Sequence, residues 1–112
     1  MKKALFTKLF YFSASFSHGR EVHGHNYTLG VTVEYSPKLD EALLAQKIQT
    51  SLIDKIHSRD LGLDVDFLKK IPISDYNLLK VFSAVLAREI RPARLHGLFL
   101  ERDGRTRLST GK

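Results

Sequence analysis

Three histidines, His18, His23 and His25, stand close together near the start of the chain. His23 and His25 are two residues apart, so on a strand they point to the same face of a sheet. Four residues separate His18 from His23, which is a common length for a hairpin loop. Such a hairpin would place His18 opposite His23, with their Cβ atoms about 5 Å apart. Three imidazoles on one face are the ligands of an open zinc site, which keeps its fourth position for water or substrate.

The alternative is that these histidines are only exposed polar side chains on a strand. A lone His-x-His pair often has no metal, and it is the third histidine at hairpin distance that favours a metal site. Neutral imidazole is the form that binds a transition metal, and zinc accepts ligation by nitrogen alone. The residue types are also compatible with copper, nickel or iron.

Length and composition indicate one domain, spanning residues 1–112, with a composition typical of globular proteins. No apolar run approaches the ~20 residues that a membrane helix needs, and no signal-peptide cleavage site is evident. We therefore expect no membrane partner. Cysteine is absent, which excludes disulfides and a thiol nucleophile and favours the cytoplasm.

The net charge of +6 is compatible with two kinds of partner. A basic surface can bind nucleic acid, or it can steer a phosphorylated small molecule toward its site. The arginines are spread along the chain, with a late group at Arg91, Arg94, Arg102, Arg105 and Arg107. No aromatic-flanked nucleic-acid motif accompanies them. We expect a small-molecule partner and no nucleic acid.

The hydrophobic pattern predicts two strands, then two helices, then two more strands. Residues 4–16 alternate and are rich in aromatic side chains, which favours a strand whose even positions face the core. The other predicted elements are a strand at 26–35, helices at 40–57 and 75–90, and strands at 98–102 and 105–109, the last two joined by an Asp-Gly turn.

This order, β-β-α-α-β-β, predicts an α+β fold in which an antiparallel sheet carries two helices on one face. A small open sheet has exposed edges, and such edges are often paired with another subunit. We therefore expect a homo-oligomer.

Two segments resemble one known family. Phe12-Ser13-Ala14-Ser15 and, more specifically, His23-Gly24-His25-Asn26-Tyr27 followed by a Val/Thr strand are similar to the 6-pyruvoyl tetrahydropterin synthase and 6-carboxytetrahydropterin synthase family. The element order also matches that family's tunnelling fold (T-fold). The resemblance implies a homotrimer or homohexamer with sites at subunit interfaces. It also implies a three-histidine Zn²⁺ site and a pterin substrate of the dihydroneopterin triphosphate type.

The family's metal ligands carry over only in part. His23 and His25 fall on its paired zinc ligands, but Phe16 holds the place of the third. His18 lies two residues further with the same strand parity, and we expect it to supply the third ligand.

Glu101, in the segment 98–101, resembles the glutamate that anchors the pterin in this family. A carboxylate can accept hydrogen bonds from both the amino group and the ring N–H of a pterin. The alternative is that Glu101 only pairs with a neighbouring arginine on the hairpin.

The family's catalytic residues are poorly kept. Gly19 stands where the family has its cysteine, and His57-Ser58 stands where it has an Asp-His pair. His57 is either a displaced base or a histidine stabilised at a helix C-terminus. Glu21 is a candidate base, a candidate partner that orients an imidazole, or a solvated loop residue.

Three functions follow as hypotheses. The first is a zinc-dependent enzyme that performs a lyase-type step on a pterin. The second is a zinc- and pterin-binding member of the family without turnover. The third is a basic interaction protein whose histidines are idle. A missing base costs about 10²–10⁴ in rate, so the usual synthase activity should be weak or absent unless His57 or Glu21 takes over.

Overall fold

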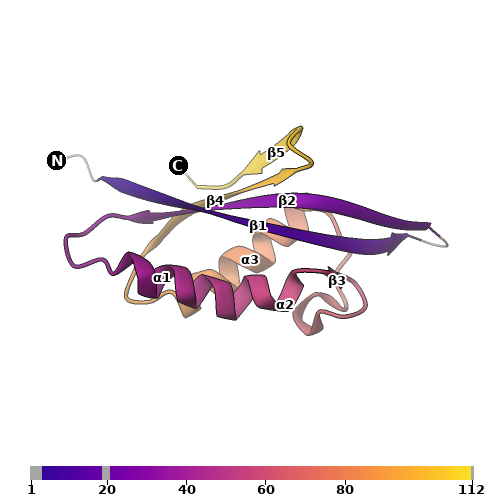
Figure 1. Cartoon of the computed structure of the whole chain (residues 1–112), viewed down its shortest axis with the longest axis horizontal. Helices are drawn as coiled ribbons and strands as arrows, with labels where there is room; N and C mark the ends of the chain where they lie inside the picture. Colours follow the sequence, from indigo (N-terminus) through magenta and orange to yellow (C-terminus); the bar gives the residue numbers. More distant parts are fainter. Residues whose placement is uncertain (1–3, 19–20, 112) are drawn as a thin grey trace.

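Within residues 4–18 and 21–111, which the computed structural model describes, the chain forms a five-stranded sheet with helices on one face (Figure 1). The strand order across the sheet is β3-β1-β2-β4-β5. In chain order the elements are β1 (Leu5–His18), β2 (Glu21–Glu34), α1 (Glu41–Ile48), a π-helical turn (Gln49–Ile53), α2 (Asp54–Ile56), β3 (Arg59–Asp60), a 3-10 turn (Asp66–Leu68), α3 (Asp75–Glu89), β4 (Leu95–Arg102) and β5 (Thr106–Ser109). The predicted α+β class and the predicted element order are confirmed.

The short strand β3 is an addition that the sequence pattern did not predict. It pairs in parallel with β1 through Ala14↔Arg59 and Ser15↔Asp60, so the sheet is not wholly antiparallel. Two residues are too few to carry a period of two, and the pairing depends on where the chain returns after α2. β3 extends the sheet at the outer edge of β1.

The hairpin between β1 and β2 has a different register from the predicted one. The ladder is antiparallel and continues to the pair His18↔Glu21, so that His23 lies opposite Phe16. The expectation that His18 faces His23 across a four-residue loop is therefore wrong. Pairing continues through residues that were predicted to be a loop, and only two residues separate the paired ends, a length typical of tight hairpins.

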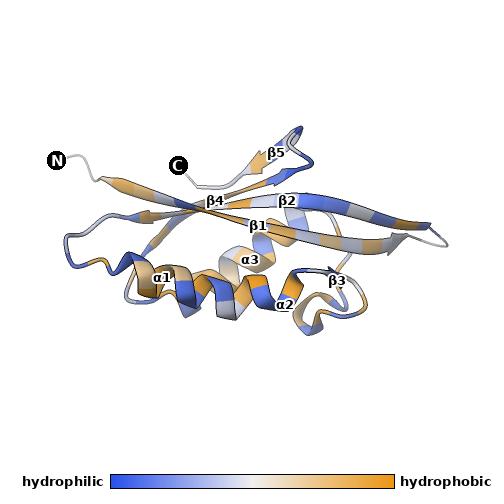
Figure 2. Ribbon diagram, in the orientation of Figure 1, coloured by the Kyte–Doolittle hydropathy of each residue, from blue (hydrophilic) through white to orange (hydrophobic). Residues whose placement is uncertain are grey.

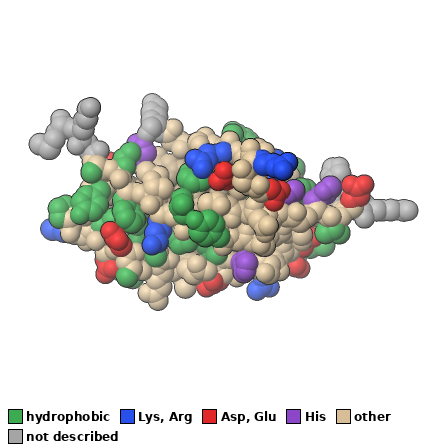
Figure 3. Space-filling view, turned by 45° about the horizontal axis from the view of Figure 1, so that its top comes forward, with side chains coloured by type: hydrophobic (Ala, Val, Ile, Leu, Met, Phe, Trp, Pro, Cys, Tyr) green, Lys and Arg blue, Asp and Glu red, His purple; other side chains and the backbone are tan. Residues whose placement is uncertain are grey.

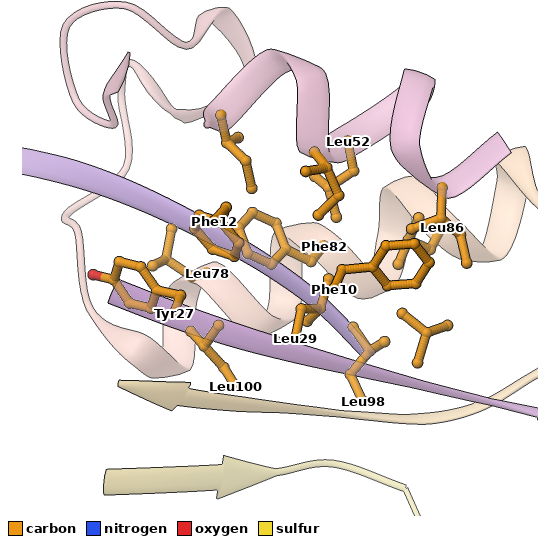
Figure 4. Close-up of a cluster of buried hydrophobic side chains, with 14 of the residues drawn as sticks. Phe10, Phe12, Tyr27, Leu29, Leu52, Leu78, Phe82, Leu86, Leu98 and Leu100 are labelled. Carbon is orange, nitrogen blue, oxygen red and sulfur yellow. The ribbon is translucent and has the colours of Figure 1, made fainter. Parts of the chain in front are cut away.

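The core lies between the helices and one face of the sheet, as the close-up of buried side chains in Figure 4 shows. In Figure 2, hydrophobic residues are interspersed with hydrophilic ones along the helices and strands that form it. Directly opposed residues of an antiparallel pair share a face, and even positions of β1 oppose odd positions of β2. Phe12 stacks on Tyr27 with ring centroids 4.8 Å apart, and Phe82 of α3 meets Phe12 edge-on at 6.3 Å. The predicted core face of β1 is confirmed at Phe10, Phe12 and Ala14.

Both long helical segments begin at side-chain caps. Asp40 accepts a hydrogen bond from the Leu43 N–H, and Ser74 accepts one from the Asn77 N–H, which satisfies backbone donors left free at a helix start. The first segment passes through the π-helical turn and ends at His57, whose ψ of 131° is no longer helical. Among the described residues, no helix has the length and apolarity needed to cross a membrane.

On the helix-free face of the sheet, the Phe99 ring lies over Gly30. The two residues are register partners on β4 and β2. A Cβ atom at Gly30 would stand 1.9 Å from Cε2 of Phe99, so only glycine allows this close approach. Gly30 therefore fixes where the Phe99 ring lies.

We expect Gly30→Ala to lower the free energy of unfolding by about 1–3 kcal/mol, because the added methyl group collides with Phe99. Urea denaturation followed by circular dichroism measures this change. Gly24→Ala on the same strand is the matched control, since no heavy atom lies within 4 Å of a Cβ there. Equal destabilisation by the two substitutions would contradict the steric argument.

Candidate functional site

His23 and His25 lie together at the hairpin end of the sheet, on the face that also carries the helices. Their positions alternate with Val22 and Gly24 along β2, and both side chains lie against the Phe16 ring. The ring centroid of Phe16 is 5.5 Å from that of His23 and 5.9 Å from that of His25. Figure 3 shows histidine and acidic side chains gathered at this end of the molecule.

Asp103 fixes the orientation of His25. The Asp103 carboxylate Oδ2 lies 2.6 Å from His25 Nδ1. Its Oδ1 accepts a hydrogen bond of 2.9 Å from the backbone N–H of Asn26. Because a carboxylate can only accept, Nδ1 is the protonated nitrogen of His25, and Nε2 presents its lone pair. This is how carboxylates orient histidines that bind metals.

Asp103 is kept ionised by the same contacts. The hydrogen bond from the Asn26 backbone, followed by the one from His25, lowers the pKa of the Asp103 carboxyl below its usual value. The Asp103 N–H also donates to the Asn26 carbonyl at 2.7 Å, so the turn after β4 is joined to β2 in both directions. The site therefore has a fixed negative charge beside His25 at neutral pH.

Glu21 lies beside His23 in a looser arrangement. Its Oε2 is 3.4 Å from His23 Nε2, and the Glu21 side chain is 77% exposed. The side chain of His25 is 19% exposed, against 42% for that of His23, so Asp103 holds the more buried imidazole. Glu21 is thus placed as a partner of an imidazole, one of the roles predicted for it, and any role as a base stays a prediction.

The described side chains do not form a complete metal site. No group of three His, Cys, Asp or Glu residues that could hold an ion is found among them. Phe16, which has no donor atom, occupies the position directly opposite His23. The side chain of His18, the predicted third ligand, lies outside the described residues. His23 and His25 offer two imidazoles of the type that zinc accepts, and both the binding of zinc and its third ligand stay predictions.

His57 is docked on the outer edge of β1. The Ser13 backbone N–H donates to His57 Nδ1 at 3.1 Å, and the Ser58 N–H donates to the Ser13 carbonyl at 2.6 Å. Because Nδ1 accepts a hydrogen bond, the proton of the neutral imidazole is on Nε2. His57 ends the helical segment as predicted, and it also has a specific backbone partner.

A continuous set of hydrogen bonds connects His57 with His25 across β1 and β2. Ser13 Oγ donates to Asn26 Oδ1 at 2.7 Å, and the Asn26 N–H donates to Asp103. His57, Ser13, Asn26 and Asp103 line one cleft of about 410 Å³. The sequence pattern showed Asp103 only as a turn residue; its contact with His25 depends on the β2–β4 register, which sequence spacing does not give.

Glu101 lies on the helix-free face. It stands opposite Thr28 of β2 and Arg107 of β5, and Arg107 Nη2 lies 3.3 Å from Glu101 Oε2. The predicted alternative, a pair with a neighbouring arginine, is thus present in the structure. Strand parity places Glu101 on the opposite face of the sheet from His23 and His25.

The fold was compared with those of known proteins. No family model matches the chain, and no curated protein matches it in sequence. The structure of 6-pyruvoyl tetrahydropterin synthase from Caenorhabditis elegans matches with a TM-score of 0.86 at 21% identity, covering 100% of this chain and 97% of that one. The chain has the fold of a 6-pyruvoyl tetrahydropterin synthase. The predicted T-fold is confirmed.

A second solved structure, an uncharacterized protein from Wolinella succinogenes, matches with a TM-score of 0.69 at 13% identity. That match covers 100% of this chain and 99% of the other. Likeness at these identities establishes the fold, and function has to be argued from the residues of the site.

We expect Asp103→Asn to release His25 from its single tautomer and to weaken metal binding about 10- to 100-fold. Nitrogen-15 NMR of the His25 ring measures the tautomer without any metal, and zinc titration measures the affinity. Asp66→Asn is the matched control. Asp66 is an exposed carboxylate that pairs with Lys69, and both residues are far from His25 in the sequence. An unchanged His25 spectrum in Asp103→Asn would contradict the orienting role.

The same variant gives a pH test. Because the folded-state pKa of Asp103 is lowered, its contribution to stability is present above the unfolded pKa of about 3.9. That contribution is lost as the pH falls through the folded-state value. The stability difference between wild type and Asp103→Asn should therefore shrink on acidification.

Proposed function

We propose that this protein is a 6-pyruvoyl tetrahydropterin synthase-like protein that binds a pterin of the dihydroneopterin triphosphate type and carries Zn²⁺ at its histidine pair. The observation that carries the proposal is the carboxylate-oriented His25 beside His23, in a chain with this fold. In a typical metal-binding histidine, one ring nitrogen donates its N–H to a carboxylate and the other nitrogen is available to the metal.

His23 and His25 would hold the zinc ion, with His18 as the proposed third ligand. A bound zinc ion would supply Lewis-acid polarisation of a substrate hydroxyl group. Asp103 keeps the Nε2 lone pair of His25 available, as its 2.6 Å contact with Nδ1 requires. Phe16 packs against both rings and shields this side of them from water.

Glu101 is the proposed anchor for the pterin ring. Its two carboxylate oxygens match the two adjacent N–H donors of a 2-amino-4-oxo ring. The net charge of +6 favours the approach of a substrate that carries phosphate groups.

The opposite placement of Glu101 and the histidines supports a site shared between copies of the chain. Strand parity directs the two sets of side chains away from each other, so one chain does not bring them to the same ligand. Beyond its short pairing with β3, the outer edge of β1 has no strand neighbour among the described residues. We propose a homotrimer or homohexamer in which such edges pair.

Lyase-type turnover is the first candidate activity, with His57 or Glu21 as the base. His57 Nε2 is the nitrogen left for proton exchange, and His57 lines the 410 Å³ cleft. Binding without turnover is the second candidate. It is favoured by the absence of any cysteine and by Phe16 in the position of a ligand.

We expect about one zinc ion per chain in the purified protein, lost in His23→Ala, His25→Ala and His18→Ala. His57→Ala should keep it, because His57 binds the β1 backbone instead. Phe16→His should bind zinc more tightly than wild type, since it adds an imidazole directly opposite His23. Elemental analysis gives the ratio, and full retention in the His23 and His25 variants would contradict the site.

We expect Glu101→Gln to weaken pterin binding at least about tenfold, because one of two charge-assisted hydrogen bonds is lost, without changing the zinc content. Fluorescence titration with neopterin measures the affinity. Product formation from dihydroneopterin triphosphate separates the two candidate activities. Unchanged neopterin affinity in Glu101→Gln would remove the anchor assignment, and an absence of turnover with intact binding would select the second candidate.

A further inference from the structure

The residues around Glu101 form a layered arrangement on the helix-free face. The Phe99 ring lies over Gly30, and the Arg107 guanidinium lies over the Phe99 ring, 4.1 Å from its centroid. The same guanidinium reaches Glu101 Oε2 at 3.3 Å. A planar cation thus rests on an aromatic face while its N–H group points at a carboxylate.

We refer to the Phe99 ring together with the Glu101 carboxylate as the Glu101–Phe99 site. Its chemistry selects a flat group that can stack on the ring and donate N–H bonds in its own plane to the carboxylate. Guanidinium satisfies both requirements through its planar donor fork. The 2-amino-4-oxo edge of a pterin or a guanine has the same N–C–N donor pattern within a flat, stackable ring.

We propose that Arg107 is an internal competitor that occupies the Glu101–Phe99 site until a ligand with a cyclic guanidine edge displaces it. The proposal deepens the proposed function and rests on it, because it concerns the same anchor. Arg107 covers the Phe99 ring and bonds to Glu101 Oε2, so it has to move before a ligand can stack on the ring and bond to the carboxylate in the same plane. The Arg107 side chain is 54% exposed, so water can solvate the guanidinium once it is displaced.

The selectivity of this site comes from the donors that a ligand offers to Glu101. A ligand that presents both the amino group and the adjacent ring N–H replaces the hydrogen bond and the ring contact that Arg107 gives up. A dioxo ring keeps a ring N–H but has a carbonyl oxygen in place of the amino group, so it offers Glu101 fewer donors in the same plane. Glu101 therefore favours 2-amino-4-oxo rings over the related dioxo rings, while Arg107 lowers the affinity for both by the same factor.

The test compares two probes that differ only in this edge. Pterin itself, 2-amino-4-oxopteridine, has the amino group, and lumazine, 2,4-dioxopteridine, lacks it. Both are titrated into the full chain by fluorescence, in wild type, Arg107→Ala and Arg107→Lys. Arg105→Ala is the matched control, because it removes the same charge from the exposed turn of the same hairpin. Glu101→Gln and the double variant Arg107→Ala with Glu101→Gln complete the set.

We expect Arg107→Ala to bind pterin about tenfold more tightly than wild type, the scale set by an exposed ion pair together with a cation–π contact. Arg107→Lys should show a smaller gain, since lysine keeps the charge but loses the planar fork. Arg105→Ala should bind pterin as wild type does. The gain should vanish in the Glu101→Gln background. Lumazine should gain by a similar factor from Arg107→Ala while binding more weakly than pterin, because it offers Glu101 fewer donors in the same plane.

Each alternative result separates the inference from the function on which it rests. Equal or weaker pterin binding by Arg107→Ala, with binding still lost in Glu101→Gln, would overturn the competitor role and leave the anchor in place. An undiminished gain in the Glu101→Gln background would show simple uncovering of Phe99 and would also overturn it. Failure of every variant to bind pterin would overturn both the inference and the proposed function.

Discussion

The register of the β1–β2 ladder is the constraint on which both faces of this molecule depend. Side chains of a strand alternate between faces, so a slip of one residue would exchange every core side chain for a solvent-facing one. The Phe12–Tyr27 stack fixes the register, because both rings are buried under α3. That same parity carries His23 and His25 to the helix side, where the ladder extends past the helices.

Beyond the apolar core, hydrogen bonds rather than buried area position the polar groups. The turn after β4 is joined to Asn26 through backbone and carboxylate, and the chain after α2 is joined to Ser13 through backbone and imidazole. Two segments distant in sequence thereby meet on neighbouring residues of β1 and β2. Asp103 and His57 are therefore both held by hydrogen bonds with strand backbone.

The elements that sequence could predict are those whose signal is local. Alternation predicted the core face of β1, and the helical spacing of apolar residues predicted the helical segments at 40–57 and 75–90. The predicted register of the β1–β2 hairpin was wrong, because strands joined by a four-residue loop and a longer ladder have the same local sequence pattern. The strand β3 could not be predicted, because two residues are too few to show an alternation. The role of Asp103 could not be predicted, because its contact with His25 joins segments that only the β2–β4 pairing brings together.

The two halves of the candidate site are positioned by separate contacts. On the helix side, Asp103 orients one imidazole through a fixed charge, and this contact involves no residue of β5. On the helix-free face, Gly30 allows the Phe99 ring to lie close to the β2 backbone. The Arg107 guanidinium contacts both that ring and the Glu101 carboxylate. The sheet lies between the two halves, and the contacts described for one include no residue of the other. The proposed metal site and the proposed ring site thus share no described contact within one chain, and only a site that combines copies of the chain would make them depend on each other.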